Sequence, residues 1–263
     1  MAEPAEAVPL SRRCAERSPV LGLGLRVMQG ILGARAAAET GYDWVFLDLE
    51  HGASDFRSLG ETMLAVLAVG LAPVVRVPNH EAALAARVLT NGALGVIFPH
   101  VDTADQAANC AAACRFAPDG HRGVPAFFPQ LGLGKVPLAE ATARLNRVTD
   151  VIVMIESAEA VANAAAIAAT PGVDGLFVGA SDLTVEMGRP GGYRDAEVQA
   201  ALRRVAEVCA THGKRAGIGG IGDAALLGAL VAEGYDFVLA GNDLDLFLPA
   251  ARARAAALRP DAG

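Results

Sequence analysis

Charged and histidine side chains close short apolar runs at several places in this 263-residue chain. They are Asp48, Glu50 and His51 after the second run, Arg76 after the third, His100 after the fourth, Glu156 after the fifth, and Asp182 after the sixth. Carboxylates, a guanidinium and imidazoles are the groups of metal binding, oxyanion stabilisation and proton transfer. These groups act together only if their runs end at one face, as the strands of a parallel barrel do.

Glu156 and Asp182 follow neighbouring apolar runs, and their carboxylates can converge at such a face. Hard divalent cations such as Mg²⁺ or Mn²⁺ are often held by one or two carboxylates, with water and substrate oxygens completing the shell. Either acid taken alone could equally cap a helix. Two acids on adjacent strand ends favour a metal site.

Arg76 ends the run Val74-Val75-Arg76, and a buried guanidinium there needs an anionic partner. It could pair structurally with Asp48 or Glu50. It could instead bind the oxygen of a 2-oxo acid and stabilise the charge that develops on it. We favour this second role, because a developing enolate calls for a fixed cation.

His51 lies three residues after Asp48, whose carboxylate could orient the imidazole ring. An imidazole oriented in this way is a plausible general base near neutral pH. His100 either lines the same site or packs at its strand end. The turn containing Gly179 and Ser181 leads from a strand into a helix, so its backbone N–H groups can bind a carboxylate.

Eight apolar runs alternate with longer amphipathic stretches, which predicts a single (β/α)8 TIM barrel. The expected strands are 20–27, 44–50, 73–77, 95–101, 151–156, 175–178, 215–219 and 237–240. We expect residues 1–19 to form a loose leader, and 20–263 to form the barrel with a C-terminal helix. The stretch 116–137 is rich in Gly, Pro and Phe, and a loop of this length often serves as a lid.

Polar residues mark the expected ends of several helices. Ser54, Thr103 and Asp223 stand where helices should begin. Gly70, Gly92, Gly213 and Gly234 stand where helices should end. In the run Gly217-Ile218-Gly219-Gly220 the spacing of a dinucleotide loop is missing, so close approach of the backbone to the site is the better interpretation.

Composition narrows the possible partners and location. The net charge of −7 and the absence of a basic segment argue against a nucleic-acid partner. No apolar run is long enough for a membrane span. The four cysteines (Cys14, Cys110, Cys114 and Cys209) lack metal-site spacing, and a chain of this size needs no disulfides, so we expect free thiols in the cytoplasm.

Four ordered segments resemble a known family: 42–52 (YDWVFLDLEHG), 74–76 (VVR), 154–156 (MIE) and 173–183 (VDGLFVGASDL). They are similar to the class II pyruvate aldolases, that is, the 4-hydroxy-2-oxoheptanedioate and 2-dehydro-3-deoxyglucarate aldolases. These are grouped with citrate lyase β-type enzymes in the phosphoenolpyruvate/pyruvate barrel superfamily. The likeness extends from Leu21 to Phe247.

The resemblance implies roles for particular residues. Glu156 and Asp182 would be the metal ligands, and His51 with Asp48 would be the base. Arg76 would bind the pyruvate oxygen. Backbone amides at Gly179 and Ser181 would hold the pyruvate carboxylate. The resemblance also implies Mg²⁺, Mn²⁺ or Co²⁺ as cofactor. It further implies a homo-oligomer, either a trimer or a hexamer built from two trimers, with exchanged C-terminal helices.

Three features depart from the family pattern. Met154 stands where many members have Gln, which removes a polar contact near the metal. Thr90 stands where many have Asp, which puts in doubt a carboxylate offered to a neighbouring subunit. The 116–137 stretch differs from that of enzymes acting on long dicarboxylates, so the acceptor aldehyde could differ as well.

The resulting hypothesis is reversible aldol cleavage of 4-hydroxy-2-oxo acids to pyruvate or hydroxypyruvate and an aldehyde. The metal would act as a Lewis acid on the 2-oxo acid, His51 with Asp48 would remove a C3 proton, and Arg76 would stabilise the enolate. No lysine ends an expected strand, which argues against a Schiff-base aldolase. Two alternatives stay open: a citrate lyase β-type enzyme acting on an acyl-CoA thioester, and a non-catalytic barrel that binds an oxo acid.

Overall fold

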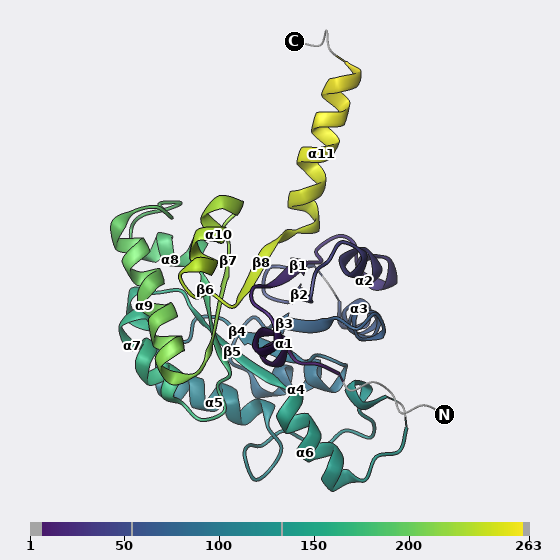
Figure 1. Cartoon of the computed structure of the whole chain (residues 1–263). Helices are drawn as coiled ribbons and strands as arrows, with labels where there is room; N and C mark the ends of the chain where they lie inside the picture. The colour runs from purple at the N-terminus through teal and green to yellow at the C-terminus, as the bar shows by residue number, and fades with distance from the viewer. Residues whose placement is uncertain (1–6, 54, 133, 260–263) are drawn as a thin grey trace.

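Eight short strands form a closed parallel barrel in the computed structural model, which describes residues 7–53, 55–132 and 134–259 (Figure 1). The strands follow one another around the barrel in chain order, and β1 pairs with β8 to close it. They are β1 (Val20–Gly24), β2 (Trp44–Asp48), β3 (Ala72–Arg76), β4 (Gly95–Phe98), β5 (Asp150–Ile155), β6 (Gly175–Gly179), β7 (Arg215–Gly219) and β8 (Phe237–Asn242). The predicted (β/α)8 barrel is confirmed.

Helices cover the outside of the barrel between successive strands (Figure 1). They are α2 (Gly30–Glu39), α3 (Phe56–Ala68), α4 (Ala82–Thr90), α5 (Ala104–Cys114), α6 (Leu138–Val148), α7 (Ala158–Ala169), α8 (Ala180–Glu186), α9 (Ala196–His212) and α10 (Ala224–Ala232). A 3-10 turn, η1 (Pro129–Leu131), lies between α5 and α6. Within the described residues, no helix has the length and apolarity that crossing a membrane requires.

The barrel interior is filled by aromatic side chains. Trp44, Phe177 and Phe237 are almost fully buried, and the ring of Phe237 lies 6.0 Å from that of Trp44 and 5.6 Å from that of Phe177. Neighbouring strands make room for these rings with glycine, because a Cβ atom on Gly22 would overlap Trp44 and one on Gly217 would overlap Phe237. The Gly217 run therefore serves core packing as well as the site.

Strand boundaries differ from the expected ones mainly at the carboxyl ends. The expected strands 20–27 and 95–101 end earlier, at Gly24 and Phe98. The last strand continues to Asn242 rather than stopping at residue 240. The apolar pattern does not mark these ends, because residues that line a site and residues that pair in the sheet can both be apolar.

Helix ends follow the predicted signals with one exception. Thr103 caps α5 and Asp223 caps α10 through side-chain hydrogen bonds, and the four glycines predicted to end helices all have positive φ. Ser54 lies outside the described residues. Asp55 is the residue that caps α3, accepting the backbone N–H groups of Arg57 and Ser58.

Part of the expected leader is ordered. Residues Leu10–Glu16 form helix α1, and Leu10 and Cys14 are buried against the barrel. The backbone N–H of Ser11 donates to the carboxylate of Asp150 at 3.0 Å. The expectation of a loose leader is therefore wrong for α1. The helix is only two turns long, and two apolar residues at i and i+4 gave too weak a pattern to predict it.

The described residues of the 116–137 stretch do not cover the carboxyl ends of the strands. Within it the side chain of Gln130 donates to the carbonyl oxygens of Leu89 at 2.5 Å and Ala93 at 2.9 Å, which precede β4. Phe116 and Leu131 are buried in the same cluster as Leu94. The stretch follows helix α5, so it returns to the amino ends of the strands. The interpretation as a lid is wrong for this reason.

Asp150 begins β5 and is 2% exposed. Its burial, together with the charge of Asp174, raises the pKa of its carboxyl group to about 7. A folded-state pKa above the unfolded value means that stability is lost as pH rises from about 4 to about 7, because the unfolded chain releases this proton first. Asp150→Asn removes that cost. We expect the variant to be more stable than wild type at pH 8 by about 1–3 kcal/mol, with the difference vanishing near pH 4.

Chemical denaturation at the two pH values measures this effect. Asp174→Asn is the matched control, because Asp174 accepts from Arg115 at 2.6 Å and from the backbone N–H of Val151 at 2.8 Å. Its removal should destabilise the protein at both pH values. Equal stability of wild type and Asp150→Asn at pH 8 would show that the buried carboxyl carries no such cost.

Candidate active site

A cavity of about 170 Å³ opens at the carboxyl ends of the strands. Its polar lining comes from the ends of β2, β3, β6, β7 and β8, from the loops after β1, β2 and β7, and from the first turn of α8. Its apolar lining comes from inside the barrel. The lining residues are Arg26, Phe46, Asp48, His51, Arg76, Met154, Phe177, Gly179, Ser181, Asp182, Gly219, Gly220, Leu239 and Asn242. Six of the predicted site residues thus lie together, and the seventh, Glu156, lies directly against Gly179.

Arg76 lies between two carboxylates. Asp48 and Arg76 are register partners on β2 and β3, and the guanidinium binds Asp48 in a bidentate pair at 3.0 and 2.8 Å. Its third nitrogen, Nη1, lies 2.9 Å from Glu50 Oε2. Burial alone would lower the pKa of Arg76, but the hydrogen bonds and charges of these acids outweigh it and raise the pKa. The guanidinium is therefore a fixed cation at the cavity wall.

Asp48 binds the backbone of His51 and does not contact its imidazole ring. The carboxylate accepts the backbone N–H groups of Glu50 at 3.0 Å and His51 at 3.3 Å. Burial raises the pKa of Asp48, but Arg76 and these N–H groups outweigh it and hold the pKa below its usual value. The exposed ring of His51 lies nearer Glu50, with 3.9 Å between Nε2 and Oε2. The expected contact between Asp48 and the ring is not found in the described residues, because Arg76 occupies the carboxylate.

Glu156 is 2% exposed and interacts with His100. Its Oε2 accepts the backbone N–H of His100 at 3.0 Å and lies 3.4 Å from Nδ1 of the ring, whose Nε2 is 3.6 Å from Glu50 Oε1. The backbone of His100 has φ 51°, a left-handed conformation that is strained for this residue. His100 therefore lies between two carboxylates beside the cavity, although it is not one of the lining residues.

Glu156 is also close to the turn from β6 into α8. Its burial and the charge of Asp182 raise the pKa of Glu156, although the His100 N–H opposes this. A Cβ atom on Gly179 would overlap Glu156 Oε1, so only glycine allows the strand to approach the carboxylate. Ser181 Oγ donates to the carbonyl oxygen of Gly220 at 3.1 Å, which joins this turn to the end of β7.

Two lining residues with polar side chains were not predicted. Arg26 lies in the loop after β1, and Asn242 ends β8. Arg26 is the charged residue that follows the first apolar run, the same signal that identified the other strand ends. It was missed because the expected strand 20–27 extended past it.

The donor set fits a divalent cation. Four carboxylates, those of Asp48, Glu50, Glu156 and Asp182, lie at or beside the cavity. Asp48 and Glu50 bind the guanidinium of Arg76, and the charges of Glu156 and Asp182 interact with each other. In the described part of the chain, neither Glu156 nor Asp182 forms an ion pair with a lysine or arginine within 4.0 Å. The described residues contain no group of three or more His, Cys, Asp or Glu side chains arranged to hold an ion. A cation here would use two carboxylates and complete its shell with water and substrate oxygens.

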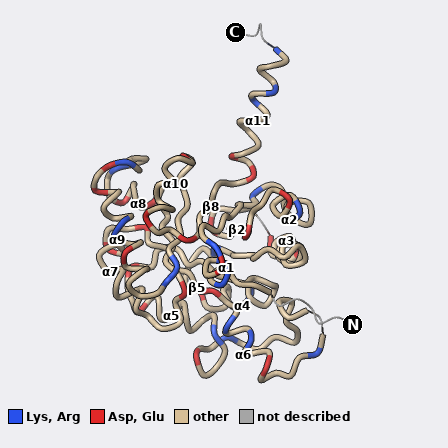
Figure 2. Tube along the Cα trace, viewed as in Figure 1, with Lys and Arg blue, Asp and Glu red and all other residues tan. Residues whose placement is uncertain are grey.

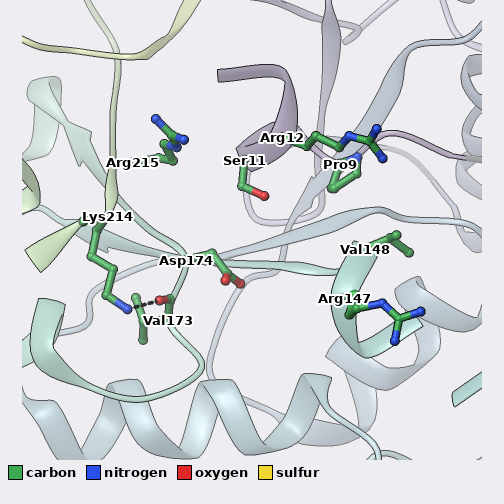
Figure 3. Close-up of a pocket in the computed structure, with 10 residues that line it drawn as sticks. Pro9, Ser11, Arg12, Arg147, Val148, Val173, Asp174, Lys214 and Arg215 are labelled. Carbon is green, nitrogen blue, oxygen red and sulfur yellow. Dashed lines mark hydrogen bonds between the residues drawn. The ribbon is translucent and has the colours of Figure 1, made fainter. Parts of the chain in front are cut away.

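A larger hollow of about 610 Å³ lies at the opposite face of the barrel (Figure 3). Two of its charged residues already maintain the fold. Lys214 Nζ donates to the carbonyl oxygen of Val173 at 2.7 Å (Figure 3), and Asp174 accepts a hydrogen bond from Arg115 at 2.6 Å. It lies at the amino ends of the strands, where residues of such barrels serve stability. We therefore place the site in the smaller cavity.

The fold is a (β/α)8 barrel. Acids, an arginine and a histidine line a cavity at the carboxyl ends of its strands, which is where barrels of this class have their active sites. The sequence profile of the HpcH/HpaI aldolase/citrate lyase family matches residues 32–250. The chain belongs to this family, which confirms the resemblance found in the sequence.

Two of the relatives similar in sequence to this chain are named as aldolases. The chain is 40% identical over 220 residues to a hydroxypyruvate/pyruvate aldolase of Paraburkholderia phytofirmans, covering 80% of this chain and 82% of the relative. It is 39% identical over 201 residues to a 4-hydroxy-4-methyl-2-oxoglutarate aldolase of Hapsidospora irregularis, covering 76% and 74%. The crystal structure of an HpcH/HpaI aldolase from Desulfitobacterium hafniense superposes with a TM-score of 0.91 at 25% identity, covering 96% and 97%.

Proposed function

We propose that this protein is a metal-dependent pyruvate aldolase that reversibly cleaves 4-hydroxy-2-oxo acids to pyruvate or hydroxypyruvate and an aldehyde. The observation that carries the proposal is the arrangement of Arg76 and four carboxylates at or beside one small cavity, in a chain that is similar to two named aldolases. The name of each of these relatives contains a 2-oxo acid. That chemistry needs a cation at the oxo oxygen, and the cavity wall supplies one.

Glu156 and Asp182 would hold the divalent cation, Mg²⁺, Mn²⁺ or Co²⁺. When bound, such an ion supplies Lewis-acid polarisation of the 2-oxo group. The guanidinium of Arg76 is held rigidly by Asp48 and Glu50, so it needs no reorganisation to stabilise negative charge developing on the oxo oxygen. Backbone N–H groups at Gly179 and Ser181, in the turn beside Glu156, would bind the substrate carboxylate.

His51 is the proposed base for the C3 proton, and its exposed imidazole lines the cavity beside Glu50. Asp48 positions this base by accepting the backbone N–H of His51, and it positions Arg76 by accepting from its guanidinium. Glu50 contacts Arg76 and His100, and His100 contacts Glu156. These contacts link Arg76 to the proposed metal ligand Glu156. Phe46, Met154 and Phe177 form an apolar floor that limits water around the reacting carbons.

Cleavage of a 4-hydroxy-2-oxo acid tests this function. The purified protein, stripped of metal with a chelator and then given Mn²⁺ or Mg²⁺, is incubated with 4-hydroxy-2-oxopentanoate, and pyruvate is measured with lactate dehydrogenase. Pyruvate release that depends on the added metal supports the aldolase. Release of acetyl-CoA from a 3-hydroxyacyl-CoA substrate, with no release of pyruvate from the 4-hydroxy-2-oxo acid, would support the citrate lyase β-type enzyme instead. Binding of pyruvate with neither reaction would support a binding protein.

We also propose that the protein is a homo-oligomer, a trimer or a hexamer, in which α11 (Asp243–Leu258) packs against a second copy. Figure 1 shows this helix projecting from the barrel. Leu246, Phe247 and Leu258 are 49%, 63% and 74% exposed. Figure 2 shows acidic residues at its base and basic residues in its outer half. An apolar helix that leaves its own barrel gains stability only if something covers it.

Phe247→Glu tests the role of this helix. We expect wild type to have a mass several times 26.9 kDa by light scattering, and the variant to shift toward the single-chain mass, because a charge replaces a buried contact. Leu138→Glu is the control: Leu138 is 56% exposed on α6, away from the proposed interface. A single-chain mass for wild type, or an unchanged mass for Phe247→Glu, would contradict this assembly.

A cytoplasmic location is part of the proposal. All four cysteines are buried and free, and burial raises the pKa of each thiol to about 12. Thiols of this kind are unreactive packing groups. They fit a reducing compartment, in which disulfides are rare.

A further inference from the structure

Arg26 stands in a loop that the fold holds in place. Asp243, at the start of α11, is 4% exposed and accepts three consecutive backbone N–H groups of this loop. The distances are 3.1 Å for Arg26, 2.8 Å for Val27 and 2.6 Å for Met28. An ionised carboxylate that accepts several N–H groups is a strong anchor. The backbone of Arg26 is therefore fixed at the cavity rim.

The side chain of Arg26 is exposed and makes one hydrogen bond at the cavity. Its Nη2 donates to the carbonyl oxygen of His51 at 2.9 Å, which directs the guanidinium to the cavity that it lines. Within the described parts of the chain, its Nε and Nη1 donate to no side chain or carbonyl group. An ordinary surface arginine loses side-chain entropy when it binds an anion. Arg26 is already directed to the cavity by its hydrogen bond to His51 and by its anchored backbone, so it should lose less.

The two arginines of the cavity differ in what they offer a ligand. Arg76 uses all three of its guanidinium nitrogens on Asp48 and Glu50. Arg26 is bound by a neutral carbonyl oxygen alone and carries an uncompensated charge. A guanidinium with free N–H groups matches the geometry of a carboxylate. Arg26 is thus the cation available to an anionic part of the substrate.

We infer that Arg26 selects an acceptor aldehyde that carries a carboxylate. This inference rests on the proposed function, in which the turn at Gly179 and Ser181 binds the carboxylate of pyruvate. The new bond joins C3 of pyruvate to the aldehyde carbon, the C3 proton is lost and the aldehyde oxygen gains one, and the second carboxylate is unchanged. The product is a 4-hydroxy-2-oxo diacid, whose distal carboxylate binds Arg26.

Two aldehydes with two carbons each provide the test. Glyoxylate carries a carboxylate where acetaldehyde has a methyl group. With pyruvate and Mn²⁺, kcat/KM is measured for both aldehydes in wild type and in Arg26→Met. We expect the ratio of the glyoxylate value to the acetaldehyde value to fall at least about tenfold in the variant, which is the effect of losing one charge-assisted hydrogen bond. The ratio cancels any loss common to both aldehydes.

Arg57→Met is the matched control, because Arg57 is exposed on α3 and pairs with Glu61 at 3.0 Å. Its ratio should equal that of wild type. An unchanged ratio in Arg26→Met would overturn the inference. Exchange of the pyruvate C3 protons needs no aldehyde, so exchange in wild type together with an unchanged ratio refutes the role of Arg26 alone. Absence of exchange refutes the proposed function itself.

Discussion

Arg76→Met is expected to lower kcat/KM for aldol cleavage by roughly 10²–10³-fold, because the fixed cation at the oxo oxygen is lost. The change should also lower the free energy of unfolding by about 3 kcal/mol, since Asp48 and Glu50 lose their shared partner in a buried setting. Steady-state kinetics and chemical denaturation measure the two effects. Arg76→Lys should recover part of the activity, because it keeps the charge without the bidentate geometry.

A second variant separates catalysis from stability. In Asp48→Asn/Arg76→Met the unpaired charge of Asp48 is removed, so stability should recover toward that of wild type while activity stays low. Activity that returned together with stability would mean that Arg76 acts only through the fold. The role of Arg76 at the oxo oxygen would then be rejected.

Glu156→Gln is expected to weaken Mn²⁺ binding by more than about 100-fold and to remove most of the activity, because a ligand charge is lost. Stability without metal should be unchanged or higher. The reason is that burial and the charge of Asp182 raise the pKa of Glu156, so the ionised group is unfavourable in the folded protein, and glutamine removes it. Calorimetric titration with Mn²⁺ and denaturation of the metal-free protein measure these opposite effects.

Glu159→Gln is the control for this change, because Glu159 lies exposed on α7, three residues further along the chain. It should bind Mn²⁺ as wild type does. Equal Mn²⁺ affinity in wild type and Glu156→Gln would exclude Glu156 as a ligand.

Much of the fold and site could be predicted because the signals were local. A strand buried on both faces is apolar along its length, and the first polar residue after it must lie at the barrel face. That rule identified Asp48, Arg76, Glu156 and Asp182 from their positions alone. Helix caps such as Thr103 were found for the same reason, since the signal and the structure lie within four residues.

The features that were missed depend on contacts between distant segments. Asp48 binds Arg76 rather than the His51 ring because the register of β2 and β3 places the two residues side by side. Arg26 is held by Asp243, a residue 217 positions away in the chain. The loop 116–137 was assigned to the wrong face because the prediction used only its length. The loop follows helix α5, and a segment after a helix leads to the amino end of the next strand. Such contacts follow from strand order and register, which the apolar pattern alone does not fix.

The most direct test of the account is exchange of the pyruvate C3 protons in D₂O, followed by NMR with metal removed and then restored, on wild type and His51→Ala. It reports formation of the enolate without requiring the correct aldehyde. The account predicts exchange in wild type that needs Mn²⁺ or Mg²⁺ and falls by at least about 100-fold in His51→Ala. No exchange in wild type with any of these metals, with pyruvate or hydroxypyruvate, would contradict it.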